Sequence, residues 1–212
     1  WSNMISINLK KRFFTSIFLF FLFFLIFNYK FILIFTLLLL GVASVLEFFN
    51  MSKKIFKNSN FIFLSNIFFT VYIFLFCTFF FYFSSFIQIK IILFIILLGC
   101  IFSDIGGYVF GKIFKGQKLT KISPNKTISG ALGSIFSCCL VIFFLNYYLT
   151  NNLNYSLIVI GIIISIFCQL GDIFFSLLKR KSKIKDTGKF LPGHGGILDR
   201  LDGILIALPT GF

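Results

Sequence analysis

The stretch Phe61–Phe83, FIFLSNIFFTVYIFLFCTFFFYF, contains no charged residue. At about 1.5 Å per residue, a helix of this length crosses the roughly 30 Å hydrocarbon core of a bilayer. An uninterrupted apolar run of this kind is typical of a transmembrane helix and not of a soluble domain. The stretch therefore predicts a membrane-spanning helix.

Apolar runs of similar character lie on both sides of this stretch. They are Phe13–Phe27, Phe31–Phe49, Ile91–Phe110, Ala131–Leu149 and Tyr155–Leu178. The chain is 58% hydrophobic and 12% charged, with a mean hydropathy of +1.02. These features predict an all-α, polytopic membrane helical bundle with about six full transmembrane helices and a short C-terminal helix. No other stretch is long enough to bury its own core, so we expect one membrane-embedded domain over residues 1–212. We expect Phe13–Phe27 to be a retained signal anchor, because no small-residue cleavage site follows it.

The basic residues predict how the chain is oriented in the membrane. With the N-terminus inside, only Lys30 and Lys90 of the 20 Lys and Arg residues fall on the outer side. Such an asymmetry over short loops is the positive-inside signal. We therefore expect a multi-pass protein of the inner (plasma) membrane with its polar motifs facing the cytoplasm.

The net charge of +14 favours anionic partners such as lipid head groups or nucleotides. We expect no nucleic acid partner, because most lysines flank apolar spans and topology already explains them.

The five cysteines indicate no site. All of them lie inside apolar runs, without a Cys-x-x-Cys pair and without a nearby histidine. A metal site needs paired spacing, so we interpret them as small buried apolar residues.

Polar residues gather in the stretch Ser176–Asp202, SLLKRKSKIKDTGKFLPGHGGILDRLD. This stretch holds three of the six acids, the only histidine and seven of the 20 basic residues. Burying charge costs several kcal/mol per group unless a partner or an ion compensates. A chain this apolar has no folding reason to collect such residues, so we interpret the stretch as a functional site.

Three aspartates are candidate ligands of a cation. Asp172 lies inside the end of an apolar span, where a carboxylate costs about 2.5 to 3.5 kcal/mol and needs a wet cavity, a cation or a basic partner. A structural ion pair is the alternative explanation. Asp199 and Asp202 share one face if the segment from Ile197 onward is helical. Their repulsion is relieved by a divalent cation or by an arginine.

Two loops are candidate phosphate sites. In Pro192–Gly196, glycines at three of five positions let backbone N–H groups approach an anion at the start of a helix. A plain glycine turn would look the same. Ser123–Thr127 offers a hydroxyl, an amide and a cation, although a solvated basic loop would also contain them.

Taken together, these motifs resemble the bacterial phosphatidate cytidylyltransferases, or CDP-diacylglycerol synthases. The Ser176–Asp202 stretch is similar to the family's C-terminal signature, with S-x-x-K-R, K-D-x-G and L-P-G-H-G-G-x-x-D-R-x-D in order. Upstream, Ser103–Tyr108, Ser123–Thr127 with Gly130, and Gly171-Asp172 are similar to its other motifs, and the resemblance includes Glu47. Family members generally continue past the signature with a full closing span, whereas this sequence ends at Phe212.

The resemblance implies a reaction in which CTP and phosphatidate give CDP-diacylglycerol and pyrophosphate at the inner leaflet, for phospholipid biosynthesis. The lipid phosphate is then the nucleophile, so acids for Mg²⁺ and bases for phosphate are the parts required. The resemblance also implies that the protein forms a homodimer and that it contacts membrane lipids.

It further implies roles for individual residues. Mg²⁺ is expected at Asp172 and Asp199, with a second cation as an open alternative. To these we add Asp202 as a supporter of the Mg²⁺ centre and Asp104 as a contributor to the polar cavity. The expected phosphate-binding residues are Lys126, Lys179, Arg180 and Arg200. Ser123 and Asn125 are expected to position the nucleotide. The glycine turn of Gly193, His194, Gly195 and Gly196 is expected to bind phosphate, with His194 either donating to it or orienting other groups.

Two other functions remain open from the sequence. A CTP-dependent polyprenol or phytol-type lipid kinase would share related motifs, but the complete Ser176–Asp202 pattern fits it less well. A lipid or ion transporter would use Asp104 and Asp172 as an intramembrane path. Inverted repeats would favour the transporter, and none is evident.

Overall fold

The computed structural model describes residues 2–120, 123, 126–152, 154–188, 190 and 195–212, with the backbone alone for residues 2–14. Within these residues the regular elements are helices, and an isolated antiparallel bridge joins Lys118 and Thr127. Two compact units form. The first comprises Trp1–Phe81 and Leu178–Arg200, and the second comprises Tyr82–Leu177 and Leu201–Phe212.

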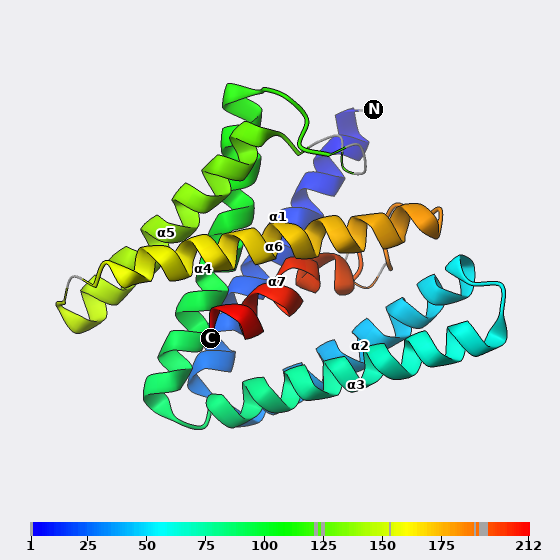
Figure 1. Ribbon diagram of the computed structural model, residues 1–212, viewed down its shortest axis with the longest axis horizontal. Helices are drawn as coiled ribbons and strands as arrows, with labels where there is room; N and C mark the ends of the chain where they lie inside the picture. Colours follow the sequence, from blue (N-terminus) through cyan, green and yellow to red (C-terminus); the bar gives the residue numbers. More distant parts are fainter. Residues whose placement is uncertain (1, 121–122, 124–125, 153, 189, 191–194) are drawn as a thin grey trace. The chain divides into compact units, whose positions relative to one another are not determined.

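The described chain contains seven helices, labelled in Figure 1. They are α1 (Ser2–Asn28), α2 (Lys30–Ile55), α3 (Ser59–Phe83), α4 (Ile87–Phe114), α5 (Ile128–Thr150), α6 (Ser156–Lys181) and α7 (Leu198–Gly211). The helices α2 to α6 are long and apolar enough to cross a membrane. The apolar part of α1 with described side chains, Thr15–Asn28, is shorter. The predicted all-α membrane bundle with a short C-terminal helix is confirmed.

Several helices end where the sequence supplies a recognisable signal. Thr127 begins α5 by accepting the N–H of Gly130 on its hydroxyl (3.1 Å), which satisfies one donor of the first turn. Lys53 and Lys54 lie in the last turn of α2, where cations interact favourably with the helix dipole. The last turn of α6 likewise carries Lys179, Arg180 and Lys181. These charged ends explain why α2 and α6 extend past their apolar runs.

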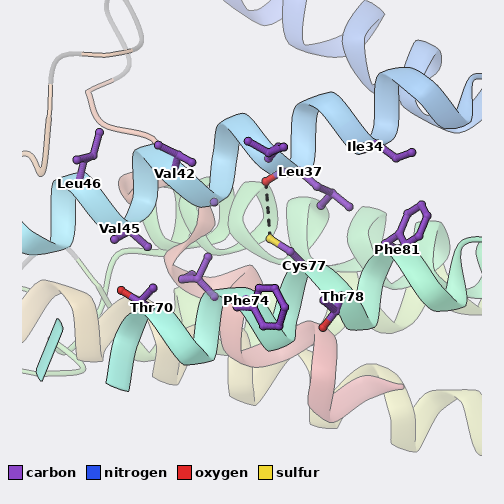
Figure 2. Close-up of a pocket in the computed structure, with 13 residues that line it drawn as sticks. Ile34, Leu37, Val42, Val45, Leu46, Thr70, Phe74, Cys77, Thr78 and Phe81 are labelled. Carbon is purple, nitrogen blue, oxygen red and sulfur yellow. Dashed lines mark hydrogen bonds between the residues drawn. The ribbon is translucent and has the colours of Figure 1, made fainter. Parts of the chain in front are cut away.

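In the first unit, α2 and α3 form an antiparallel pair (Figure 1). The rings of Phe48 and Phe69 stack with centroids 4.0 Å apart, and the Asn66 amide donates to the Ser52 hydroxyl (2.9 Å). Thirteen residues line a cavity of about 490 Å³ between the two helices, and Figure 2 shows the Cys77 thiol pointing across it to the Leu37 carbonyl. The lining is apolar, so this cavity offers nothing to hold a phosphate.

In the second unit, small residues allow helices to approach closely. Gly106 of α4 lies against Ser137 and Gly133 of α5. Gly171 of α6 lies against the backbone of Asp202 and Gly203 in α7, where an added Cβ would meet the Asp202 carbonyl oxygen at 2.5 Å. Close approach through small residues is the usual basis of helix packing in membranes. The contact at Gly171 also determines where its neighbour Asp172 lies relative to α7.

Candidate active site

The first unit brings several signature residues together around Asp199, at the start of α7. The Lys179 ammonium donates to Asp199 Oδ1 at 2.9 Å. The backbone N–H groups of Thr187 and Gly196 donate to Oδ2 at 2.9 and 3.0 Å. The side chains of Asp199 and Lys179 are 8% and 14% exposed, so the pair is largely shielded from water. We call Glu47, Lys179, Thr187, Gly196 and Asp199 the Asp199 cluster.

The charged form of Asp199 is favoured by this environment. Burial raises its pKa, but the hydrogen bonds from Lys179, Gly196 and Thr187 and the charge of Lys179 outweigh burial. The pKa of Asp199 is therefore below its ordinary value. Each of these donors binds the carboxylate and not the neutral acid, which is the physical reason for the direction of the shift.

The Asp199 cluster also contains Glu47, an acid in the C-terminal half of α2. Its side chain is buried, with 7% exposed. Glu47 Oε2 accepts the hydroxyl of Thr187 (2.7 Å) and the N–H of Leu198 (2.9 Å), and Oε1 accepts the N–H of Ile197 (3.0 Å). The carboxylate lies at the N-terminal end of α7, where the helix dipole favours negative charge.

Two glycines permit this arrangement. Gly195 has φ +86°, a left-handed conformation in which a side chain is strained. Gly196 is buried, and a Cβ there would lie 2.7 Å from the Gly188 nitrogen, close to both Glu47 and Thr187. The predicted glycine turn is thus required sterically at these two positions. The N–H of Gly196 donates to the Asp199 carboxylate (3.0 Å).

The second unit contains another lysine–aspartate pair. Lys126 Nζ lies 2.6 Å from Asp172 Oδ2, and the two side chains are 28% and 19% exposed. The backbone of Lys126 makes two hydrogen bonds: Leu119 N–H donates to the Lys126 carbonyl (2.7 Å), and Lys126 N–H donates to the Ser123 carbonyl (3.1 Å). The expectation that Asp172 faces a compensating partner is met by this lysine.

Polar residues continue along α6 from Asp172 towards its middle. Ser165 and Ser103 of α4 share a hydrogen bond (3.0 Å), and the Cys168 thiol lies 3.7 Å from Asp104 Oδ1. Residues 165, 168 and 172 recur at helical spacing, so they share one face of α6. We call Asp104, Lys126, Cys168 and Asp172 the Asp172 cluster.

The remaining predicted site residues have varied surroundings. The backbone N–H of Gly203 donates to Asp202 Oδ1 (3.1 Å). The side chain of Ser123 is half-buried. Arg180 and Arg200 are exposed. Asn125, Gly193 and His194 lie outside the described residues. Asp199 belongs to the first unit and Asp172 to the second.

The two aspartates have different capacities for a cation. An ionised carboxylate offers about four lone-pair sites. Among the described residues, Asp199 accepts three hydrogen bonds, which leaves one lone-pair site on its Oδ1. Asp172 accepts one hydrogen bond, on Oδ2, which leaves its Oδ1 open. Hard oxygen donors of this kind suit Mg²⁺. Among the described residues no three Asp, Glu, His or Cys side chains gather as a metal site. The donor set fits a cation held by few carboxylates together with waters or substrate phosphates.

The sequence as a whole matches the profile of the Cytidylyltransferase family over residues 1–212. The chain belongs to this family. Similar proteins include phosphatidate cytidylyltransferases of Staphylococcus haemolyticus (strain JCSC1435) and Staphylococcus aureus (strain COL), each 45% identical over 109 residues. A protein of the same name from Staphylococcus epidermidis (strain ATCC 12228 / FDA PCI 1200) is 43% identical over 109 residues.

The match to these phosphatidate cytidylyltransferases covers only part of this chain and part of each relative. In all three, the matched residues are 50% of this chain and 42% of the relative. The family resemblance drawn from the signature motifs is confirmed by the match of the profile to the whole chain.

The sequence alone does not predict the contact between Glu47 and Thr187 of the signature stretch. The resemblance to the family includes Glu47 but implies no role for it. One signal was available: a carboxylate within an apolar span needs compensating partners. The sequence does not say which partners, because the donors are 140 to 151 positions away.

Proposed function

We propose that this cytidylyltransferase-family chain transfers the cytidylyl group of CTP to phosphatidate. A phosphate oxygen of the lipid attacks the α-phosphorus of CTP, and the bond from that phosphorus to the bridging oxygen of the β-phosphate breaks. The products are CDP-diacylglycerol and pyrophosphate. The nucleophile is already an anion near neutral pH, so the site needs no Ser-His-Asp arrangement. The observation that carries the proposal is the 45% identity over 109 residues to proteins named phosphatidate cytidylyltransferase.

In this proposal the carboxylates hold a cation. Asp172 and Asp199 bind Mg²⁺, and Asp202 and Asp104 add negative potential nearby. Bound Mg²⁺ neutralises charge that develops on the transferred phosphoryl group and on the leaving pyrophosphate. The open lone pairs of Asp172 and Asp199 support these two assignments. The number of cations stays open between one and two.

The basic residues bind the phosphates. Lys126 is paired with Asp172 and Lys179 with Asp199. The flexible side chain of a lysine can move its charge from a carboxylate to a nearby phosphate, because an ammonium group requires no fixed bonding geometry. Arg180 and Arg200 are exposed, and their planar guanidinium groups suit bidentate contact with phosphate oxygens. Ser123 and Asn125 position the nucleotide, and the turn from Gly193 through His194 and Gly195 to Gly196 borders its phosphates. The cation and these donors together stabilise charge in the transition state.

The proposed reaction takes place at the cytoplasmic face of the inner membrane. The five long apolar helices and the basic loops support a multi-pass protein with CTP and the inner-leaflet lipid on the same side. We also propose that the working form is a homodimer within the lipid bilayer.

An assay with purified protein tests the proposal. The protein in lipid nanodiscs is incubated with α-labelled CTP, phosphatidate and Mg²⁺, and both CDP-lipid and pyrophosphate are measured. We expect the two products in equal amounts and none without phosphatidate. Release of CDP with phosphorylation of an added polyprenol would instead indicate a lipid kinase. Movement of lipid across vesicles without turnover of CTP would indicate a transporter.

A further inference from the structure

The carboxylate of Glu47 is committed to one segment of the chain. Its three hydrogen-bond donors among the described residues are on Thr187, Ile197 and Leu198, in the stretch from the end of α6 to the first residue of α7. The effect of these bonds is therefore to attach this stretch to α2.

Thr187 connects Glu47 to Asp199. Its hydroxyl donates to Glu47 Oε2 at 2.7 Å, and its backbone N–H donates to Asp199 Oδ2 at 2.9 Å. Asp199 in turn binds Lys179 through its other oxygen. A change at Glu47 thus reaches Asp199 through one intervening residue, within a cluster that is largely buried.

We propose that Glu47 is a positioning residue for nucleotidyl transfer, holding Thr187 and the start of α7 so that Asp199 and Lys179 face the reacting groups. This inference rests on the proposed function. Glu47 hydrogen-bonds to Thr187, Ile197 and Leu198, so its effect on Asp199 and Lys179 is exerted through Thr187 and the backbone at the start of α7. Groups that orient a metal ligand or a phosphate-binding lysine usually affect activity by about 10- to 100-fold.

The variant Glu47→Gln tests the proposal, because it keeps the volume of the side chain. The amide replaces one acceptor oxygen with a donor, which then faces the N–H or O–H groups of the signature stretch. We expect kcat to fall about 10- to 100-fold and the Mg²⁺ concentration for half-maximal activity to rise. The matched control is Ser52→Ala, which removes a buried polar contact with Asn66 elsewhere on α2. It should leave kcat and the Mg²⁺ dependence unchanged.

Substitutions at Thr187 test the connection. Thr187→Val keeps the shape but loses the hydroxyl, and we expect it to lower kcat in the same direction as Glu47→Gln. Thr187→Ser restores a hydroxyl and should recover most of that loss. A decrease in activity that merely tracks the folded fraction, with unchanged Mg²⁺ dependence, would overturn the positioning role.

Hydrogen–deuterium exchange separates this inference from the proposed function. In Glu47→Gln we expect faster exchange at residues 187–188 and 195–198, with α4 unchanged. If the wild-type protein makes no CDP-lipid but this exchange still increases, the proposed function fails while the attachment by Glu47 stands. If the enzyme is active and exchange in Glu47→Gln equals that of the wild type, the Glu47 assignment is overturned.

Discussion

The oxygens of Asp199 make structural hydrogen bonds, and the proposed reaction asks the same oxygens to bind a cation. In the fold it accepts Lys179 and two backbone N–H groups, which orders the start of α7. In the proposed reaction it also holds Mg²⁺. A carboxylate already oriented by three donors loses little side-chain entropy when it binds a cation, so the structural contacts prepare the residue for the chemistry.

The variant Asp199→Asn is expected to abolish most of the turnover. The amide is a poorer Mg²⁺ ligand, and its N–H₂ group would face the donors that now bind the carboxylate. We expect kcat to fall on the order of 100-fold or more. Stability should decrease by about 1 to 3 kcal/mol, because a buried donor loses its acceptor. CDP-lipid formation and thermal unfolding in detergent measure the two effects. Activity close to that of the wild type would contradict the assignment of Asp199 to the metal.

The stability that Asp199 supplies should depend on pH. Its pKa in the fold is below the ordinary value, so its charged form favours folding. This contribution is fully present above the ordinary value of about 4 and disappears as the pH falls through the lower, folded value. The melting temperature should therefore decrease more between pH 7 and pH 3 in the wild type than in Asp199→Asn. Equal decreases in the two proteins would show that Asp199 does not titrate as inferred.

At the scale of helices, the polar clusters depend on close packing through glycine. Gly171 allows α6 to approach α7 at the residue next to Asp172, and Gly196 allows the signature stretch to approach Glu47. An added side chain at Gly171 would meet only backbone atoms, of Asp202 and Gly203. At Gly196 it would meet the Thr187 hydroxyl and the Glu47 carboxylate as well as the Gly188 nitrogen. The positions of both clusters therefore follow from residues that carry no functional group.

The variant Gly171→Ala should weaken the contact between α6 and α7. Its Cβ would lie 2.5 Å from the Asp202 carbonyl oxygen and 3.0 Å from the Cα of Gly203, which requires the backbone to move. We expect a destabilisation of about 1 to 3 kcal/mol, measured by thermal unfolding in detergent. Gly41→Ala is the control, because its Cβ would meet the Cys77 sulfur at 3.3 Å and the Ile73 side chain at 3.4 Å. Both variants gain the same helix propensity, so an equal effect on stability would contradict the steric argument.

At the scale of the whole chain, the apolar runs are sufficient to predict the five long helices α2 to α6, whereas the described apolar part of α1 is shorter than the full span predicted there. The predicted span Ile91–Phe110 lies within α4, for example, and Ala131–Leu149 lies within α5. Their ends were less well predicted, because α4 continues to Phe114 where hydropathy no longer marks the helix. The sequence predicts Asp172 and Asp199 as candidate ligands, because charge in an apolar chain needs compensation. It does not predict their partners Lys126 and Thr187, since contacts between segments distant in sequence have no local pattern.

The orientation of the chain can be tested with single cysteines. The five native cysteines would be replaced, and one cysteine introduced at Lys57, Lys115, Ser85 or Asn152, which are exposed residues near helix ends. With the N-terminus inside, alternate threading puts positions 57 and 115 in the cytoplasm and positions 85 and 152 outside. A membrane-impermeant maleimide on intact spheroplasts should label only 85 and 152, and should label 57 and 115 after permeabilisation. Labelling of position 115 in intact cells would place the Lys126 loop away from CTP and contradict the proposed reaction.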